Sequence, residues 1–225
     1  LRPDKKGLGM RIVFQPDGIT VPAVLADLQA FRAWVHSARF PEKGRVDWVG
    51  GTVEVDVSPE EVNTHGTPKS EIARELGNLV QATDLGVVLI DASRLTCPDA
   101  DLSCEPDVVV VLFESVEAGR VRLVERMGSD PERHIEIEGA ADLVVECVSN
   151  SSVHKDTQDL PPRYHRAGVR EFWLIDARTD PPTFLLHHRA AQDFRLQARD
   201  AEGFARSAVL GRSVRLVRLP SRAGL

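Results

Sequence analysis

The chain has 225 residues, of which 28% are charged and 42% are apolar, and its formal net charge is −6. This length suffices for one domain with a buried core, and the composition is that of an ordinary globular protein. The negative charge excludes a polybasic arm and any binding to nucleic acid or membrane through bulk charge alone. Nucleic acid remains allowed as a substrate, because a local basic groove can lie on an acidic protein.

The N-terminal part of the chain is predicted to contain two helices separated by a hairpin. Apolar residues recur at helical spacing over 21–39, with Thr20 as the expected N-cap. The segment RVDWVGGTVEVDV then has two β-rich runs around Gly50-Gly51, which predicts a tight hairpin. Residues 68–82 again place apolar side chains on one helical face, so a second helix is expected.

Short, continuously apolar runs follow, and such runs are typical of central strands that are buried on both faces. They are GVVLIDA (86–92), DVVVVLF (107–113), DLVVECV (142–148) and EFWLIDA (171–177). In RHIEIEG (133–139) we expect the isoleucines to pack inward and the polar face to be solvated. The runs over 183–189, 194–199 and 214–219 alternate better, which indicates an antiparallel C-terminal extension with one wet face.

These elements predict an α/β fold in which helices flank one mixed central sheet, with an N-terminal hairpin and a C-terminal antiparallel extension. Residues 1–20 are expected to form an N-terminal extension, and residues 21–225 a single domain.

The cysteines and the hydropathy pattern indicate the compartment. Cys97, Cys104 and Cys147 form no CxxC motif, so a structural zinc site and a disulfide framework are not expected. A reducing cytoplasm is the predicted location. No apolar run reaches the roughly 20 residues of a membrane span, so no membrane association is expected.

Two carboxylates coincide with strands that should be buried. Asp107 opens one apolar run and Glu146 lies inside another. A buried carboxylate needs a partner, a proton or a cation, and two of them on neighbouring strands can converge on Mg²⁺. The alternative is that the two are unrelated acids that cap turns or bind an arginine.

Several segments in order resemble the Uma2 family (DUF820) over about residues 25–190. They are RVDWVGGTVEVDVSP, a helix after His65, EPDVVVV, DLVVECVSNSS and YHRAGVREFWLID. The resemblance implies a restriction-endonuclease-like core of the PD-(D/E)XK type. It also implies an endonuclease that needs Mg²⁺ or Mn²⁺ and hydrolyses phosphodiester bonds of nucleic acid, expected to be DNA, by a metal-activated water. Homodimerisation is expected from the same resemblance.

The resemblance assigns roles to individual residues. Asp107 corresponds to the acid of the "PD" motif and Glu146 to the second acid. Asp47 stands where the family usually has Glu and is the expected third metal ligand. His65 stands where the family commonly has His and is the expected base or phosphate contact. Asp156 and Tyr164 match the downstream "D…K…Y" segment.

The chain departs from the family pattern at the catalytic lysine. The family usually has Lys four residues before the Tyr, where this chain has Leu160, and Val148 replaces the Lys of the basic motif. Lys155 is the expected replacement, because residues 149–158 are predicted to be a loop that lets it reach the site. Pro161-Pro162 indicate that the following helix starts late, and Gly168 is expected to end it.

Other interpretations remain open for single residues. Asp47 could simply pair with Arg45, and His65 could be a helix cap. Tyr164 is favoured as an aromatic anchor on the sheet, although it could hydrogen-bond near the metal. Asp176 is interpreted as a turn residue.

Two other functions compete with the nuclease. One is a catalytically retired family member that serves as a binding or assembly module, which Leu160 and the acidic charge favour. The other is a hydrolase of a smaller phosphoester, which an acidic surface would suit better than long DNA.

Overall fold

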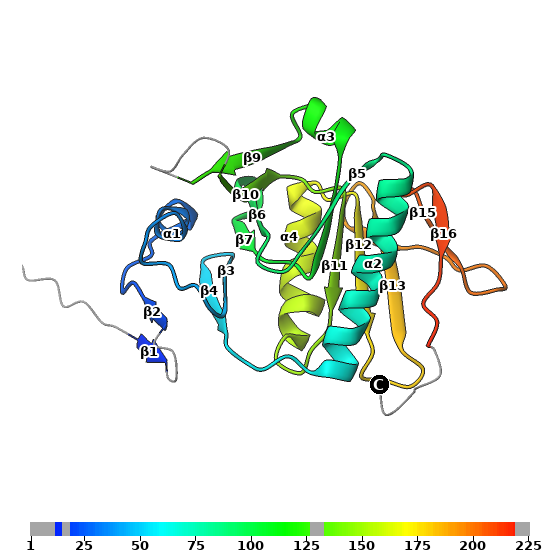
Figure 1. Ribbon diagram of the computed structural model, residues 1–225, viewed down its shortest axis with the longest axis horizontal. Coiled ribbons are helices and arrows are strands. Elements are labelled where there is room, and N and C mark those ends of the chain that lie inside the picture. Colours follow the sequence, from blue (N-terminus) through cyan, green and yellow to red (C-terminus); the bar gives the residue numbers. More distant parts are fainter. Residues whose placement is uncertain (1–11, 15–18, 127–132, 219–225) are drawn as a thin grey trace, which may run out of the picture.

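We describe residues 12–14, 19–126 and 133–218 in a computed structural model, whose ribbon is drawn in Figure 1. Within them, two large β-sheets lie next to each other and helices flank them. The helices are α1 (Leu28–Val35), α2 (Thr67–Ala82), α3 (Phe113–Glu117) and α4 (Leu160–Ala167).

The first six-stranded sheet includes the hairpin around Gly50-Gly51 at one edge. In spatial order it contains β4 (Thr52–Asp56), β3 (Arg45–Val49), β7 (Leu102–Cys104), β6 (Arg94–Cys97), β10 (His134–Gly139) and β9 (Val121–Glu125). The second six-stranded sheet contains β14 (Phe194–Leu196), β13 (Thr183–Arg189), β12 (Glu171–Asp176), β11 (Leu143–Cys147), β8 (Val108–Leu112) and β5 (Gly86–Ile90). Two small antiparallel pairs complete the strands, β1 (Ile12–Phe14) with β2 (Ile19–Val21) and β15 (Ala205–Ser207) with β16 (Arg212–Val214).

The predicted fold class is confirmed, with two large mixed sheets where one was expected. The four apolar runs become β5, β8, β11 and β12, which are neighbours in the second sheet. β11 pairs parallel with β12 and antiparallel with β8. This mixed pairing places the residue before β8 beside the end of β11, where the candidate acids lie.

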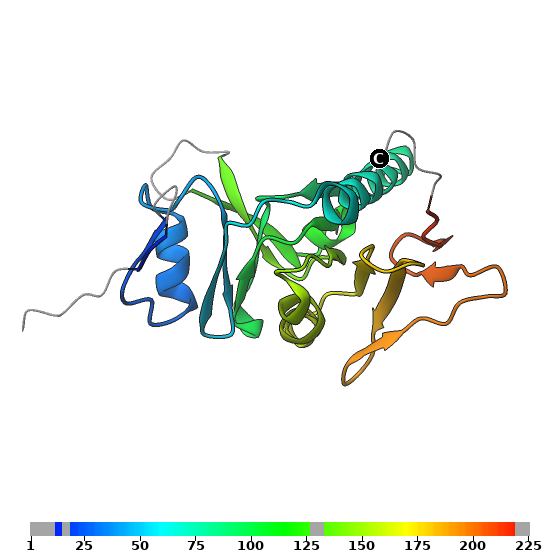
Figure 2. The same cartoon turned by 90° about the horizontal axis from the view of Figure 1, so that it is seen from below.

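The second sheet is covered on both faces, as continuous apolar runs require. Figure 2 shows α2 and α4 on opposite sides of it. Val145 and Cys147 of β11 pack with Leu76 and Val80 of α2 in one apolar cluster. Val144 and the flanking Val148 pack on the other side in a cluster with Leu160 and Tyr164 of α4. Because strand residues alternate between faces, Glu146 shares the α4 side with Val144.

The N-terminal hairpin is confirmed, but the first helix is shorter than predicted. Gly50 and Gly51 have φ of +57° and +88°, the left-handed values that a two-residue hairpin turn of this type requires. The helix begins at Leu28, where the Asp27 side chain accepts a hydrogen bond from the Ala30 amide at 2.8 Å. Thr20, the predicted N-cap, instead lies in β2 and pairs with β1.

One prediction about the later elements is wrong. Residues 149–158 are not a loop throughout: the backbone is helical from Val153, and a π-helical segment over Lys155–Asp159 leads directly into α4. The Leu160 amide donates to the Lys155 carbonyl and closes the wider turn of this segment. The two prolines come after this residue, in the first turn of α4, where a missing backbone N–H is tolerated. Gly168 ends α4 with φ of +94°, as predicted.

The C-terminal strands are shorter than their alternating patterns indicated. In the predicted run 194–199 only Phe194–Leu196 pairs with β13 as a strand. In the run 214–219 only Val214 belongs to a strand, because its partner β15 is three residues long, and position 219 lies outside the described residues.

The polar face of β10 also differs from the prediction. Ile137 is buried as expected, but Glu136 is buried too, at 3% exposure. Its carboxylate contacts Arg32 of α1 and His36, the residue that caps the end of this helix, so α1 covers this face of the strand. A helix that is remote in the sequence therefore turns an apparently wet face into an internal one.

Candidate active site

Asp107 and Glu146 come together where β8 meets β11. Val108 is the register partner of Val145, so the preceding residue of β8 lies beside the following residue of β11. The Asp107 amide donates to Glu146 Oε2 at 3.4 Å, and the Cys147 amide donates to Asp107 Oδ2 at 2.8 Å. Both carboxylates are only 1% exposed. The sheet pairing thus holds two acids side by side in the interior.

The hairpin brings a third acid and an arginine to the same place. Arg45 and Asp47 are two residues apart on β3, so both side chains point to the same face. Arg45 Nη2 donates to Asp107 Oδ1 at 2.8 Å. Asp47 Oδ1 accepts from the Glu105 amide at 3.0 Å. Arg45 therefore bridges the two sheets by binding the acid at the start of β8.

Lys155 reaches the site from the helical segment before α4. Its Nζ lies 3.0 Å from Asp47 Oδ2. Burial would lower the pKa of this lysine, but the carboxylates of Asp47, Glu146 and Asp156 together outweigh it and raise the pKa above its ordinary value. The lysine is thus held as a buried cation. Leu160, at the position where the family usually has Lys, is buried in the apolar cluster on α4 instead.

Asp156 is the next residue, and it is also buried, at 1% exposure. Its Oδ2 accepts a hydrogen bond from Ser152 Oγ at 2.5 Å. Its Oδ1 is buried and, among the described residues, has no hydrogen-bond partner.

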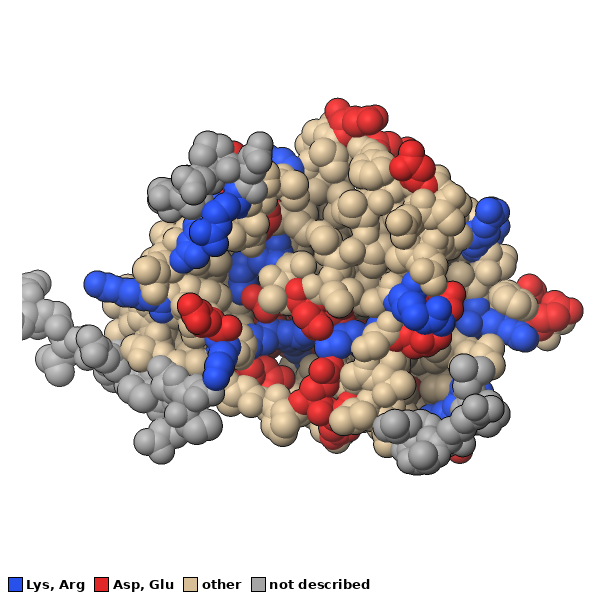
Figure 3. Space-filling view, viewed as in Figure 1, with Lys and Arg blue, Asp and Glu red and all other residues tan. Residues whose placement is uncertain are grey.

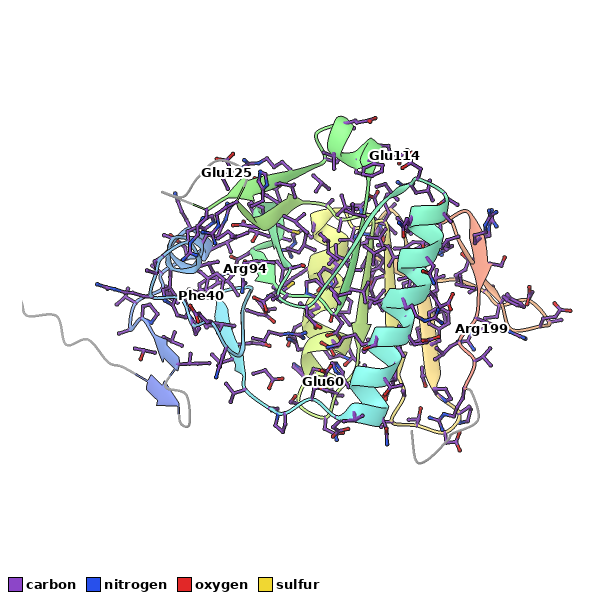
Figure 4. The ribbon with its side chains drawn as sticks, in the orientation of Figure 1. Phe40, Glu60, Arg94, Glu114, Glu125 and Arg199 are labelled. Atoms are coloured by element: carbon purple, nitrogen blue, oxygen red, sulfur yellow. The ribbon has the colours of Figure 1, made fainter. Side chains whose placement is uncertain are left out.

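His65 lies at the entrance to α2 and contacts the same centre. Its Nε2 is 3.4 Å from Asp107 Oδ2, and its Nδ1 is 2.8 Å from Glu60 Oε1. Lys69, one turn further along α2, contacts Glu60 and lies 2.9 Å from Asp91 Oδ1. Figure 4 labels Glu60 at this end of α2. The hydrogen bond to Asp107 raises the pKa of His65, because it outweighs the opposing effect of burial.

Tyr164 combines the two roles that the sequence left open. Its ring is fully buried against Phe172 on the sheet, with ring centroids 5.7 Å apart. Its hydroxyl donates to Glu146 Oε1 at 2.5 Å and lies 3.4 Å from Cys104 Sγ. Asp176, by contrast, accepts from the Arg178 amide at 3.0 Å in a turn.

The pKa values of the two central acids are shifted in opposite directions, and that of Asp107 is lowered. Burial alone would raise the pKa of Asp107, but the hydrogen bond from His65 and the charge of Arg45 hold it well below its usual range. Burial opposes the charge of Arg45, but the carboxylates of Asp107, Asp47 and Glu146 more than compensate and raise its pKa. Asp107 is therefore an ionised carboxylate bound to a guanidinium.

Glu146 and Asp156 are shifted in the opposite direction. Burial raises the pKa of Glu146 well above its usual range, and the negative charges of Asp156 and Asp107 add to the effect. Burial also raises the pKa of Asp156, to about 6, against the opposing influence of Lys155 and of the Ser152 hydrogen bond. Both acids therefore lack sufficient positive charge around them.

The charges of the buried centre do not balance. Four carboxylates face two cations, the acids being Asp47, Asp107, Glu146 and Asp156 and the cations Arg45 and Lys155. Around this centre the charges are matched, since Arg94 binds Glu105 and the pair His65 and Lys69 faces Glu60 and Asp91. If all four acids are ionised, the described residues leave two negative charges uncompensated, which is the charge that one divalent cation supplies.

The donor set also fits such a cation by type. Carboxylate oxygens are the ligands that Mg²⁺ and Mn²⁺ prefer, and one or two of them suffice when water and phosphate complete the shell. In the described part of the chain, no group of three or more His, Cys, Asp or Glu side chains is arranged to hold a metal ion. The fit therefore rests on oxygen chemistry and on the uncompensated charge.

A cavity of about 800 Å³ opens beside the acids, between the hairpin, the start of α2 and the loop after β11. Its acidic lining residues are Asp56, Glu60, Glu61, Asp91 and Glu105, and its basic ones are Lys43, Arg45, His65 and Lys69. Figure 3 shows acidic and basic side chains intermingled over the hollowed middle of this face. A second cavity of about 200 Å³ is lined by Asp47 and Lys155. Ser151 and Asp56, whose side chains hydrogen-bond at 2.9 Å, line both.

Several residues of this centre were not singled out by the sequence analysis. Arg45 was considered only as a partner of Asp47, although its position two residues away on one strand put it on the same face. Lys69 and Glu60 were missed, although Lys69 follows His65 by one helical turn. Glu105 was missed because its contact with the Asp47 acid is made through its backbone amide.

Comparisons with known proteins agree with this architecture. The family model Uma2, described as "Putative restriction endonuclease", matches residues 28–215. Among solved structures the chain is similar to a "putative nuclease belonging to DUF820" from Anabaena variabilis ATCC 29413, with a TM-score of 0.54. The two share 17% sequence identity, and the match covers 82% of this chain and 90% of that one. No match to a curated protein was found. Of the helices in the described ranges, none has the length and apolarity needed to cross a bilayer.

Proposed function

The chain belongs to the Uma2 family, and from this membership we propose that it is a metal-dependent nuclease whose active site is the buried centre around Asp107 and Glu146. The observation that carries the proposal is the excess of buried carboxylate at this centre. A carboxylate that is buried without compensation costs several kcal/mol. An ordinary scaffold would not keep two such charges, whereas a divalent cation accounts for them.

Asp107 and Glu146 would hold Mg²⁺ or Mn²⁺, with Asp47 as the third acid of the set that the sequence indicates. When bound, the cation would supply Lewis acidity toward a phosphate oxygen and would lower the pKa of a nearby water. Tyr164 fixes one carboxylate oxygen of Glu146 by its hydrogen bond, so the orientation of this ligand does not depend on the cation.

Lys155 is the cation proposed to act on the reacting phosphate. Its ammonium is buried and already oriented by Asp47, so it costs little reorganisation during the reaction. In this role it orients the attacking water and balances negative charge that develops on the phosphate. It would take the role of the lysine that the family usually has at the position of Leu160. It does so from a different place in the chain, one residue before Asp156. Arg45 is a second, partly buried cation at the same acids.

Nucleic acid, with DNA as the expected polymer, is the substrate class that the family description favours. The cavity contains local basic groups, Lys43, Arg45 and Lys69, which could contact a phosphodiester despite the net charge of −6. Homodimerisation and a cytoplasmic location belong to the same proposal.

A hydrolase of a smaller phosphoester is the second candidate function. It is favoured by the acidic side chains on the cavity wall, which would repel the dense charge of a duplex. Its volume of about 800 Å³ is also in the range of small-molecule pockets.

The proposal is tested by Mn²⁺ binding and by cleavage. Calorimetry should detect Mn²⁺ binding to the unmodified protein and no binding to Asp107→Ala or Glu146→Ala. Plasmid and oligonucleotide substrates should be cleaved in Mg²⁺ or Mn²⁺ by the unmodified protein only. Cleavage retained by a folded Glu146→Ala protein would contradict the assignment of the site.

Salt dependence separates the two candidate substrates. Binding of duplex DNA should weaken steeply between low and moderate salt, because condensed counterions are released. A small phosphoester should show a much shallower dependence. Metal binding without turnover of either class would instead favour the catalytically retired binding module.

A further inference from the structure

We propose that Asp156 is the third carboxylate ligand of the metal, and that Asp47 is not a ligand but the residue that positions Lys155. This inference rests on the proposed function, since it assigns the ligands of the same metal. It moves one ligand from the hairpin to the helical segment before α4.

The free oxygen of Asp156 is the main argument. The carboxylate is 1% exposed, and its Oδ1 is buried with no hydrogen-bond partner among the described residues. A buried polar atom without a partner costs about 1–3 kcal/mol, and more if it is charged. Such an atom is therefore rare unless it binds something that is added to the folded chain.

Asp47 differs from Asp156 in this respect. Its Oδ1 accepts from the Glu105 amide at 3.0 Å and its Oδ2 binds Lys155 Nζ at 3.0 Å. Both of its oxygens are thus engaged by donors of the chain itself. Loss of the Lys155 contact would be needed before Asp47 could become a ligand, and this would leave a buried ammonium without its partner.

Asp156 lies in a buried segment close to the same two acids. It follows Lys155, which already contacts the centre, and both residues are buried because the π-helical segment over Lys155–Asp159 lies against the site. Its negative charge acts on Glu146, and the charge of Asp107 acts on Asp156. Ser152 binds the other oxygen, Oδ2, and so fixes the carboxylate in place as a neighbouring group does for a metal ligand.

The test compares matched variants of the full chain by Mn²⁺ calorimetry. Asp156→Asn keeps the size of the side chain and an oxygen that accepts from Ser152. Asp47→Asn removes the same charge from the other acid and is the control. We expect Asp156→Asn to weaken Mn²⁺ binding by at least about 10-fold, since loss of even an outer-shell partner of a ligand costs about that much. Asp47→Asn should change it by less than about 3-fold while slowing cleavage.

The outcomes are distinct. Wild-type Mn²⁺ affinity in folded Asp156→Asn would overturn this inference and leave the proposed function intact. Equal losses in the two variants would also overturn it, because they would reflect the lost charge and not a lost ligand. Absence of Mn²⁺ binding in the unmodified protein would overturn the inference together with the proposed metal site.

A second readout does not use activity or metal affinity. Without metal, removing the uncompensated charge should raise the Tm of Asp156→Asn above that of the unmodified protein. If Asp156 is instead a structural partner of Ser152, the Tm should fall. Should Asp156→Asn not fold, Asp156→Ser keeps a polar group beside Ser152 and is measured in the same way.

Discussion

Two clusters of buried charge lie on the two large sheets, and they are built differently. On β10, Glu136 and Glu138 face Arg32, His36 and Arg122. Arg32 Nη2 lies 2.8 Å from Glu136 Oε1, and His36 Nε2 lies 2.9 Å from Glu136 Oε2. Arg122 Nη2 lies 2.6 Å from Glu138 Oε1, and Arg32 also binds Glu138. Every carboxylate of this cluster has a cation.

The cluster at β8 and β11 has more acid than cation. Asp107 and Asp47 each have a cation, whereas the described residues give Glu146 and Asp156 only neutral hydrogen-bond donors. The first cluster holds α1 on the sheet and needs nothing further. The second is incomplete as folded. Burial of charge alone therefore does not single out a candidate site, whereas burial of unbalanced charge does.

The largest effect is expected from removing the charge of Glu146 in the second cluster. Glu146→Gln keeps an oxygen that can accept from Tyr164, so the packing should survive. Mn²⁺ binding and cleavage should fall by at least about 100-fold, because a direct ligand is lost. Calorimetry and an oligonucleotide cleavage assay measure both. Near-normal Mn²⁺ binding by Glu146→Gln would contradict the idea that the unbalanced cluster binds metal and the balanced one does not.

The next largest effect distinguishes the role of the Lys155 ammonium in the second cluster from that of the proposed metal ligands. Lys155→Met removes the ammonium but keeps the apolar stem. Cleavage should fall by about 100-fold, in line with the loss of one preorganised charge in other active sites. Mn²⁺ affinity should not weaken. A single-turnover cleavage assay together with calorimetry tests this, and unchanged cleavage would show that Lys155 does not replace the missing lysine.

The balanced cluster should respond in stability and not in metal binding. Glu136→Gln leaves Arg32 and His36 without their buried partner, and because Arg32 is partly exposed we expect a loss of about 2 kcal/mol. Urea unfolding measures it. The Mn²⁺ affinity of the folded variant should equal that of the unmodified protein. A large change in affinity would mean that the two clusters are coupled.

The smallest effect is a pH dependence that only the unbalanced cluster should produce. The pKa of Asp156 is raised to about 6 and that of Glu146 is raised as well, so the folded state binds more protons than the unfolded state below these values. Stability of the metal-free protein should therefore increase as the pH falls from 7 toward 5.

This contribution is measured as the Tm difference between the two pH values, expected to be about 2–4 °C. It should shrink in Asp156→Asn and in saturating Mn²⁺, which keeps the carboxylates ionised. An identical pH dependence in all three cases would assign it to other groups, such as His65, whose raised pKa acts in the same direction.

Much of the fold could be predicted because its signals are local. Gly50-Gly51 supplies the positive φ values of the hairpin, and the apolar runs are long enough to become β5, β8, β11 and β12. The predicted start of α1 was wrong because apolar spacing continues before Asp27, whose capping contact outweighs it. The predicted loop before α4 was wrong because two prolines suggested a late start, while a π-helical segment accommodates them.

The candidate site was predicted in part. Asp107 and Glu146 stand out because an acid in an apolar strand is unusual wherever it is found. The contact between Lys155 and Asp47 could not be derived from local sequence, because 108 positions separate the two residues. The burial of Glu136 could not be predicted, because it depends on where α1 packs and not on the strand itself.

The sequence by itself determined the strands, the hairpin and the two acids of the central sheet, since each depends on neighbours along the chain. Only the tertiary structure decided which charges are balanced. Arg45 binds Asp107, Lys155 binds Asp47, and no donor from the described part of the chain reaches one oxygen of Asp156. Coulomb energy depends on the distance between atoms and on their burial, and both are set by packing between segments that are far apart in the chain.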